Sequence, residues 1–263
     1  MITRLYSMDH LRGHVAVVTG CSAGIGAALA MKLVKAGLIV VGLARRIIRL
    51  QELKTAMEEN NMVGKFYPLE CDLTNENDIL KAFKWIDDNL GGIHFLINNA
   101  GIVRISSIMG GSTDNWQEVI NCNVMAPAIC SKEAYKLMKK HDVIHGHIIQ
   151  INSITGHSYS VNPGNKMYNA SKQALRVLTE GLRHEIAAAG DGHIKVSSIS
   201  PGFVDTEIFD AAKIHKSKLN PSVTLSAEEM ADMIIFVMAT QPNILIAEMI
   251  VLSRGRTIQT YPS

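Results

Sequence analysis

The sequence lacks any hydrophobic run long enough to cross a membrane. Its longest apolar runs, such as residues 38–43, have the length of a strand and fall far short of the ~20 residues that a membrane-spanning helix needs. The first six residues show no hydrophobic signal core, and the last five carry no prenylation, retention or peroxisomal signal. We therefore expect a cytoplasmic protein with no membrane span.

An excess of charge of one sign is also missing. The 26 Lys and Arg residues nearly balance the 24 Asp and Glu residues, the formal net charge is +2, and no block of like charges occurs. A nucleic-acid-binding surface or a basic membrane-binding tail would need such a block, so we expect neither kind of partner.

Cysteine is scarce, and its spacing excludes the common cysteine-based sites. The four cysteines form no CxxC pair and have no cluster of histidines beside them; they are Cys21, Cys71, Cys122 and Cys130. Reduced, buried thiols are therefore favoured over a disulfide or a metal site, and we expect no bound metal.

What the sequence does contain is a regular alternation of strand-like and helix-like segments. We predict strands at 14–19, 38–43, 65–70, 93–98, 147–152, 194–200 and 247–252, and helices at 24–36, 47–59, 75–89, 115–140, 168–189 and 226–239. Strands that alternate strictly with helices pair in parallel through crossover connections. The sequence thus predicts an α/β fold: a doubly wound, Rossmann-type, seven-stranded parallel sheet with helices on both faces.

Local signals mark several ends of these helices. Thr74 and Ser226 are candidate N-caps, and Gly37 and Gly190 suit the position just after a helix. The stretch 205–225 has weak periodicity, and we expect a loop with short helices over a cleft.

A glycine-rich turn follows the first predicted strand. Gly20, Gly24 and Gly26 have the spacing G-x-x-x-G-x-G, which suits a tight turn, a close approach to a pyrophosphate and a close helix–sheet contact. Such glycines often only mark a turn, but their place in an alternating pattern favours a dinucleotide site at a helix N-terminus. The predicted phosphate-binding residues are Gly20, Ser22, Ala23, Gly24, Ile25 and Gly26.

The end of the second predicted strand indicates which nicotinamide cofactor binds. An acidic residue at this place binds the ribose 2′-hydroxyl of NAD(H), whereas an arginine accommodates the 2′-phosphate of NADP(H). This sequence has no acid here but has Arg45 and Arg46, which favours NADP(H) over a merely basic surface.

Polar residues end the next two strands at the same edge. Asp72 and Leu73 follow the third strand, where Asp72 would accept a hydrogen bond from the adenine amino group or else cap a turn. Asn99, Ala100 and Gly101 follow the fourth strand. Because parallel sheets bind ligands at the carboxyl ends of their strands, we assign all five residues to the cofactor site.

Candidate catalytic residues follow the fifth predicted strand. Ser153 ends it, and Tyr168 and Lys172 are four positions apart on one helix face. A phenol is a poor base at neutral pH, but a neighbouring ammonium lowers the phenol pKa and makes it a usable acid and base. The same spacing recurs at Tyr135 and Lys139 without an upstream strand-end serine, and we interpret that copy as a solvated helix face.

The order and spacing of these motifs resemble those of the short-chain dehydrogenase/reductase family. The resemblance runs from about residue 13 to the C-terminus and covers Thr19, Gly20, Gly24, Gly26, Asn98, Asn99, Ala100, Gly101, Asn123, Ser153, Tyr168, Lys172, Pro201 and Gly202. Within the family, the chain resembles the dehydrogenase/reductase member 11 group and the insect farnesol dehydrogenase-like enzymes.

The resemblance implies a role for each matching residue. Tyr168 would be the general acid/base, Lys172 would lower its pKa and hold the nicotinamide ribose, and Ser153 would orient the substrate oxygen. Asn123 would hold a helix distortion and a proton-relaying water, and Asn99 would lie beside the cofactor. The segment that would close on the nicotinamide contains Pro201, Gly202, Val204 and Thr206. Cys21 departs from the alanine usual in the glycine turn and would place an oxidisable thiol near the phosphates.

The sequence shows no repeat, low-complexity tract or long linker, so we expect a single domain over residues 1–263. We place a nucleotide-binding part at about 13–110 and a catalytic and substrate part at about 111–263. Residues 207–222 and 154–165 would shape the substrate pocket. Candidate wall residues, unless they are ordinary packing, are Phe203, Ile208, Phe209, Tyr159, His157 and Met167. The two longest predicted helices would build a homodimer or homotetramer.

Together these features predict an NADP(H)-dependent oxidoreductase that moves a hydride between the nicotinamide and the alcohol or carbonyl carbon of a small apolar substrate. An isoprenoid such as farnesol, a retinoid or a steroid would fit. Two alternatives stay open. One is an NAD(H)-linked dehydrogenase of the same fold, and the other is a cofactor-binding sensor without catalysis.

Overall fold

The computed structural model describes residues 8–158, 163–208 and 224–255. Its strands are β1 (Val15–Thr19), β2 (Ile39–Ala44), β3 (Lys65–Glu70), β4 (Phe95–Asn98), β5 (His147–Ile151), β6 (Lys195–Pro201) and β7 (Glu248–Val251). Its longer helices are α1 (Gly24–Lys35), α2 (Ile47–Glu59), α3 (Glu76–Leu90), α4 (Thr113–Ile120), α5 (Ala126–Lys140), α6 (Lys166–Ala188) and α8 (Ala227–Met238).

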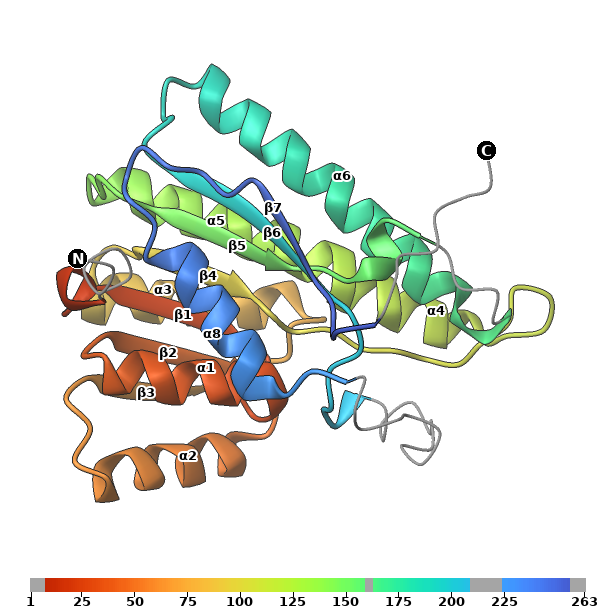
Figure 1. The fold of residues 1–263 in the computed structure, drawn as a ribbon, viewed down its shortest axis with the longest axis horizontal. Helices are drawn as coiled ribbons and strands as arrows, with labels where there is room; N and C mark the ends of the chain where they lie inside the picture. The colour runs from red at the N-terminus through yellow and green to blue at the C-terminus, as the bar shows by residue number, and fades with distance from the viewer. Residues whose placement is uncertain (1–7, 159–162, 209–223, 256–263) are drawn as a thin grey trace.

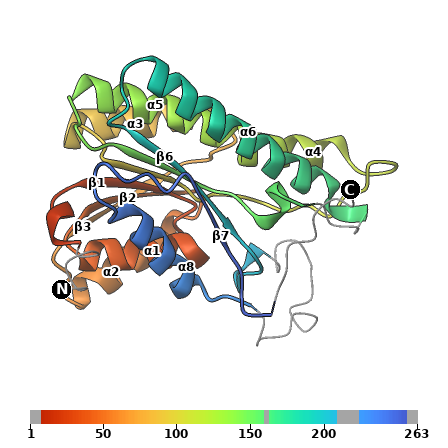
Figure 2. The same ribbon diagram turned by 45° about the horizontal axis from the view of Figure 1, so that its top comes forward.

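The seven strands form one parallel sheet in the order β3-β2-β1-β4-β5-β6-β7. Helices α1, α2 and α8 lie on one side of the sheet, and α3, α5 and α6 lie on the other (Figures 1 and 2). The predicted doubly wound fold is therefore confirmed. The chain reverses its direction of growth between β1 and β4, which opens a crevice at the carboxyl ends of these strands.

Each face of the sheet buries its own hydrophobic core. On one face, side chains of β1 and β2 pack with those of α1 and α8, with Leu29, Leu33 and Ile234 fully buried. On the other face, the second cluster joins strand residues to α3 and α5 and includes Ile79 and Ile86. Strands covered on both faces need apolar residues at successive positions, which explains why β1 reads Val-Ala-Val-Val without alternation.

Differences from the sequence prediction occur at the ends of elements and in one long helix. The predicted helix 115–140 consists of α4 and α5 separated by a π-helical turn, Asn121–Met125. The predicted N-cap Thr74 was wrong by one residue, because the side chain of Asn75 caps α3 by accepting a hydrogen bond from the Asn77 amide. The predicted stretch 205–225 lies mostly outside the described residues.

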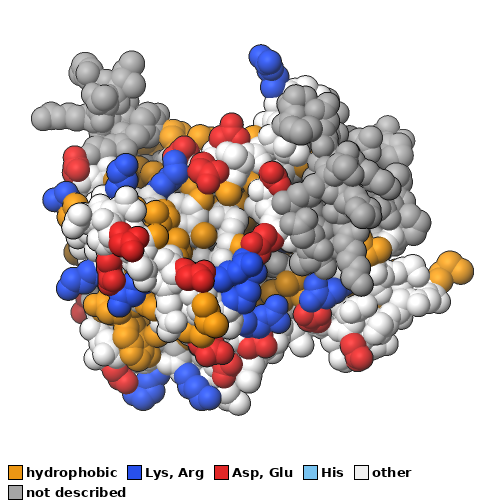
Figure 3. All heavy atoms as spheres, turned by 90° about the horizontal axis from the view of Figure 1, so that it is seen from below, with side chains coloured by type: hydrophobic (Ala, Val, Ile, Leu, Met, Phe, Trp, Pro, Cys, Tyr) orange, Lys and Arg blue, Asp and Glu red, His pale blue; other side chains and the backbone are white. Residues whose placement is uncertain are grey.

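The surface carries mixed charge. On the face seen from below in Figure 1, basic and acidic side chains are interspersed and no broad area of one sign is visible (Figure 3).

None of the helices in the described part of the chain is long and apolar enough to cross a membrane. All four cysteines are free and buried, as predicted.

The N-terminus of α8 provides a direct test of a capping interaction. Ser226 Oγ accepts a hydrogen bond from the Glu229 amide, and the Glu229 carboxylate accepts one from the Ser226 amide, 2.7 Å away. Replacing Ser226 by Ala should lower the free energy of unfolding by about 1 kcal/mol, because the Glu229 amide loses the side-chain oxygen that accepts its hydrogen bond. Ser112→Ala is the control, since Ser112 precedes α4 without a side-chain cap. Equal losses of stability in both variants, measured by denaturant unfolding, would contradict this account.

Candidate active site

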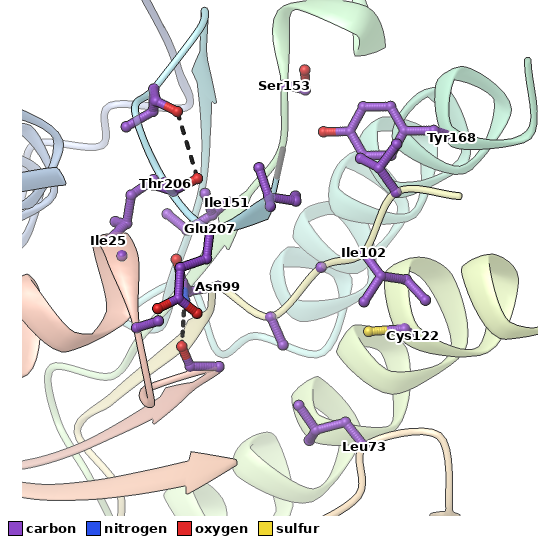
Figure 4. A pocket seen from close by; sticks show the side chains of 18 of the residues that line it. Ile25, Leu73, Asn99, Ile102, Cys122, Ile151, Ser153, Tyr168, Thr206 and Glu207 are labelled. Carbon is purple, nitrogen blue, oxygen red and sulfur yellow. Dashed lines mark hydrogen bonds between the residues drawn. The ribbon is translucent and has the colours of Figure 1, made fainter. Parts of the chain in front are cut away.

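A pocket of about 500 Å³ opens at the carboxyl ends of the strands. Its walls come from the β1–α1 turn, the ends of β2 to β6 and the first turns of α6. Figure 4 shows Tyr168 and Ser153 at one end of the pocket, with the Tyr168 hydroxyl pointing inward, while Ile25, Thr206 and Glu207 lie at the other side. The pocket thus brings together the residues predicted to bind the nucleotide and those predicted to be catalytic. We call the part of the pocket around Tyr168 and Ser153 its chemical end.

The glycine turn after β1 is too tightly packed for side chains. Gly20 has a φ of 67°, and a Cβ there would lie 2.8 Å from the Cα of Ala100. A Cβ on Gly26 would lie 2.6 Å from both the Gly20 carbonyl oxygen and the Asn99 side chain. The turn is held from β4, because Asn99 Nδ2 donates to the Thr19 carbonyl oxygen at 2.9 Å. Asn99 therefore braces the turn as well as lining the pocket.

The N-terminus of α1 is suited to bind an anion. Its N-cap residue, Ala23, has no side chain that can accept from the first amides, and no acidic residue lies in the first turn. Ala23, Gly24 and Ile25 line the pocket. Amides at a helix start that lack a capping side chain attract phosphate through hydrogen bonds and the helix dipole, so these residues fit a dinucleotide pyrophosphate.

Arginines gather at the end of β2, where we expected a 2′-phosphate to bind. Arg45 and Arg46 both line the pocket. Arg46 Nε and Nη2 donate to Ser22 Oγ at 3.0 and 2.9 Å, and its Nη1 donates to the carboxylate of Glu207. Arg49, one turn into α2, donates to the same carboxylate. Sequence reasoning missed Arg49, although its spacing of three from Arg46 on a helix places both on one face.

Asp72 lines the pocket but is engaged by its own turn. Its Oδ1 accepts hydrogen bonds from the Thr74 amide at 3.0 Å and from the Thr74 hydroxyl at 2.8 Å. The turn-capping alternative to the adenine contact is thus present in the structure. Leu73, next to it, lines the same wall.

Tyr168, Ser153 and Lys172 converge at the chemical end of the pocket. The Ser153 hydroxyl donates a hydrogen bond to Tyr168, and Lys172 Nζ lies 5.9 Å from the centre of the Tyr168 ring. Lys172 is only 4% exposed, and its Nζ donates to the Ile151 carbonyl oxygen at 2.9 Å.

The pKa values at this end are set mainly by burial. Burial raises the pKa of Tyr168 above its ordinary value, and the hydrogen bond from Ser153 opposes this shift. The lowering of the Tyr168 pKa that we expected from Lys172 stays a prediction, because in the protein alone burial is the larger cause and raises this pKa. Burial also lowers the pKa of Lys172 to about 8. At neutral pH most molecules therefore still carry the ammonium.

Asn123 lies in the π-helical turn, behind the pocket wall. Its Oδ1 accepts from the Ile102 amide and its Nδ2 donates to the Ile102 carbonyl oxygen, both at 2.9 Å. Nδ2 also donates to Ser171 Oγ at 3.1 Å. The extra residue of the π turn aims this side chain inward, so that it ties the loop after β4 to α6.

The segment after β6 forms another wall of the pocket. Pro201, Gly202, Val204 and Thr206 line it, and Val204 pairs with Leu225 in a short parallel bridge. A Cβ at Gly24 would lie 3.0 Å from Thr206 Cγ2, so this segment lies directly against the glycine turn.

The pocket contains every cofactor and catalytic residue expected from the sequence except Gly26 and Asn123, which lie just behind its wall. Among the expected substrate-wall residues, Phe203 and Ile208 line the pocket. His157 instead lies 2.8 Å from Glu248. Tyr159 and Phe209 lie outside the described residues, as does most of 207–222.

Sequence reasoning also missed a charged pair in the pocket wall. Arg104 donates two hydrogen bonds to the Glu118 carboxylate, at 2.8 and 2.7 Å, and both side chains are about a quarter to a third exposed. The two residues are 14 positions apart on different elements, so no local pattern marked them.

The second Tyr-x-x-x-Lys copy lies on a partly exposed helix face outside the pocket, where the Tyr135 hydroxyl, at 2.6 Å, and the Lys139 ammonium both donate to Asp191. One further expectation needs correction. Cys21 is fully buried, and burial raises its thiol pKa, so the oxidisable thiol expected near the phosphates is an unreactive core residue. Across the described residues, His, Cys, Asp and Glu side chains form no group able to hold a metal.

Comparisons with known proteins place this site in a family. Residues 14–217 match the family described as short chain dehydrogenase. The chain belongs to the short-chain dehydrogenase family. This short-chain dehydrogenase is 42% identical to a farnesol dehydrogenase of Aedes aegypti, over 92% of its length and 96% of the relative's. It is 41% identical to dehydrogenase/reductase SDR family member 11 of Homo sapiens, over 92% of this chain and 94% of the relative.

A solved structure shares the fold closely. The short-chain type dehydrogenase/reductase from Mycobacterium marinum aligns with a TM-score of 0.84 and 25% identity, over 95% of this chain and 97% of that one. The chain is therefore an oxidoreductase of the short-chain dehydrogenase family, with the Rossmann-type sheet that the family shares.

The packing of the glycine turn predicts a specific failure. Gly26→Ala should destabilise the protein by about 1–3 kcal/mol and abolish nucleotide binding, because the new methyl group meets backbone oxygen that cannot move aside. Gly192→Ala is the control, since its Cβ would meet nothing within 4 Å. Thermal unfolding and nucleotide titration of both variants check this. Normal binding by Gly26→Ala would show that the turn is not under the constraint described.

Proposed function

We propose that this chain is an NADP(H)-dependent oxidoreductase that interconverts an alcohol with a ketone or aldehyde on a small apolar substrate. The observation that carries the proposal is the convergence of Tyr168, Ser153 and Lys172 in the pocket that also contains the uncapped start of α1. Membership of the short-chain dehydrogenase family supports the reaction class.

When bound, the nicotinamide supplies or accepts the hydride. In the reducing direction, Tyr168 gives its hydroxyl proton to the substrate oxygen, and in the oxidising direction it takes that proton back. Ser153 donates a hydrogen bond to the same oxygen and so favours its developing charge. The Lys172 ammonium favours the phenolate form of Tyr168 during the transfer. Asn123 fixes the positions of the loop after β4 and of α6, which carries Tyr168 and Lys172.

The preference for NADP(H) rests on the end of β2. Arg45 and Arg46 line the pocket there, and no acidic residue is available from this strand end to bind a ribose 2′-hydroxyl. A guanidinium binds a phosphate through two parallel hydrogen bonds, which a 2′-hydroxyl cannot match.

The substrate class is inferred from the pocket lining. The apolar side chains that line the pocket include Ile102, Val103, Ile154, Phe203 and Ile208. The similarity to a protein named farnesol dehydrogenase supports an isoprenoid alcohol or aldehyde, and a retinoid or steroid would also match this lining.

We further propose a homodimer or homotetramer in the cytoplasm. Exposed apolar side chains follow one another on α6, where Val177 is 71% and Leu178 42% exposed, and Met125 before α5 is 48% exposed. Burying such a surface in a symmetric helix contact would stabilise an assembly. Four reduced, buried thiols suit a reducing compartment.

The assignment of Tyr168 is tested by a matched pair of variants. Tyr168→Phe should lower turnover by at least about 10²–10⁴-fold while cofactor binding is kept, because only the transferable proton is lost. Tyr135→Phe removes the hydroxyl of the second Tyr-x-x-x-Lys copy, away from the pocket, and should keep turnover. The assay follows NADPH absorbance with farnesal, retinal, steroid ketones and small diketones. A Tyr168→Phe enzyme as active as the unmodified protein would refute the assignment.

The cofactor preference is tested at the arginines. Arg45→Asp combined with Arg46→Ile should weaken NADPH binding by about tenfold or more and improve the relative binding of NADH, because two phosphate-binding cations are replaced by an acid and an apolar group. Fluorescence titration with both cofactors measures this. An unchanged preference for NADPH would show that Arg45 and Arg46 do not set the preference and that the 2′-phosphate binds elsewhere.

A further inference from the structure

The Glu207 carboxylate forms ion pairs with two arginines near the end of β2, Arg46 before α2 and Arg49 within it. It reaches them from the opposite side of the pocket. Its Oε2 accepts from Arg46 Nη1 at 2.8 Å, and its Oε1 accepts from Arg49 Nη1 at 2.6 Å. Both carboxylate oxygens therefore face guanidinium groups, although Glu207 is 161 positions from Arg46 in sequence. Figure 4 shows its carboxylate between the glycine-turn side of the pocket and Thr206.

The contact uses the same chemistry as a bound phosphate monoester. A guanidinium binds a carboxylate or a phosphate through the same parallel N–H donors, so the two anions compete for the same arginine side chains. The hydrogen bonds from Arg46, and then from Arg49, hold the pKa of Glu207 below its ordinary value. The Glu207 carboxyl group is thus ionised at neutral pH. Like charges placed at one site disfavour each other, so both anions cannot share the arginines without cost.

We propose that Glu207 is an internal competitor for the 2′-phosphate of NADP(H) at Arg46 and Arg49. This inference rests on the proposed function, because it assumes that the 2′-phosphate binds at these arginines. A ligand with a 2′-phosphate has to displace the carboxylate, whereas a ligand with a 2′-hydroxyl does not. Glu207 therefore narrows the difference in affinity between NADP(H) and NAD(H), and it acts as a specificity-determining residue.

The test measures binding of the full-length protein without any substrate. Glu207→Gln keeps the shape of the side chain and removes its charge. Both ion pairs are about half exposed and therefore weak, so the Kd for NADPH should fall about three- to tenfold, which corresponds to about 0.7–1.4 kcal/mol. The Kd for NADH should change by less than about twofold, since charge effects beyond the direct contact are screened.

Adenosine 2′,5′-bisphosphate and 5′-AMP serve as probes that lack the nicotinamide. In calorimetric titrations, Glu207→Gln should bind the bisphosphate more tightly by the same factor and leave 5′-AMP nearly unchanged. Glu52→Gln is the matched control, because it removes an equal charge from an exposed position on the same helix as Arg49. Its affinities should stay close to those of the unmodified protein.

Three results would overturn the inference: unchanged bisphosphate affinity in Glu207→Gln, equal tightening of NADH, or equal tightening in Glu52→Gln. The proposed cofactor preference fails separately, on the Arg45 and Arg46 double variant. The unmodified protein could bind NADPH and NADH equally while Glu207→Gln gains affinity for the bisphosphate alone. That result would support competition by Glu207, and the competition would explain why the unmodified protein does not prefer NADPH.

Discussion

The contact between the glycine turn after β1 and the end of β4 is the constraint on which the rest of the site depends. Asn99 Nδ2 holds the Thr19 carbonyl oxygen, and the Thr19 hydroxyl accepts from the amides of Asn99 and Ala100. This contact joins the two strands that flank the topological switch point. It fixes where α1 begins, and thereby where its free amides point.

Burial sets the protonation states of Tyr168 and Lys172 at the chemical end of the pocket. A buried lysine keeps its proton less readily than a solvated one, and a buried phenol resists losing its own. The protein alone therefore holds Tyr168 as a neutral proton donor next to a cation whose pKa is about 8. Because burial disfavours the phenolate, a negative charge on the Tyr168 oxygen has to be favoured at the moment of transfer by Lys172 and Ser153 in the proposed reaction.

Sequence periodicity was sufficient to predict the sheet, because strands buried on both faces are apolar throughout and alternate with amphipathic helices. Motif spacing likewise indicated Tyr168, Lys172 and the glycine turn, which are local patterns. Interactions between distant segments could not be predicted in this way. The pairing of Glu207 with Arg46, the pairing of Arg104 with Glu118 and the turn that engages Asp72 depend on which loops meet at the sheet edge. The rise in the Tyr168 pKa depends on solvent exclusion, which no spacing encodes.

The π-helical turn at Asn121–Met125 accommodates a single extra residue between α4 and α5. A π turn closes its hydrogen bonds over five residues where an α turn closes them over four, so the wider turn absorbs the extra residue and the helix on each side keeps its face. Deleting one residue within this turn would restore ordinary helical hydrogen bonding and leave Glu118 beside Arg104 and Val119 in the core. The deletion would instead remove the place of Asn123, and with it the hydrogen bonds that tie the loop after β4 to α6. The π turn thus positions one side chain without changing how the helices around it pack.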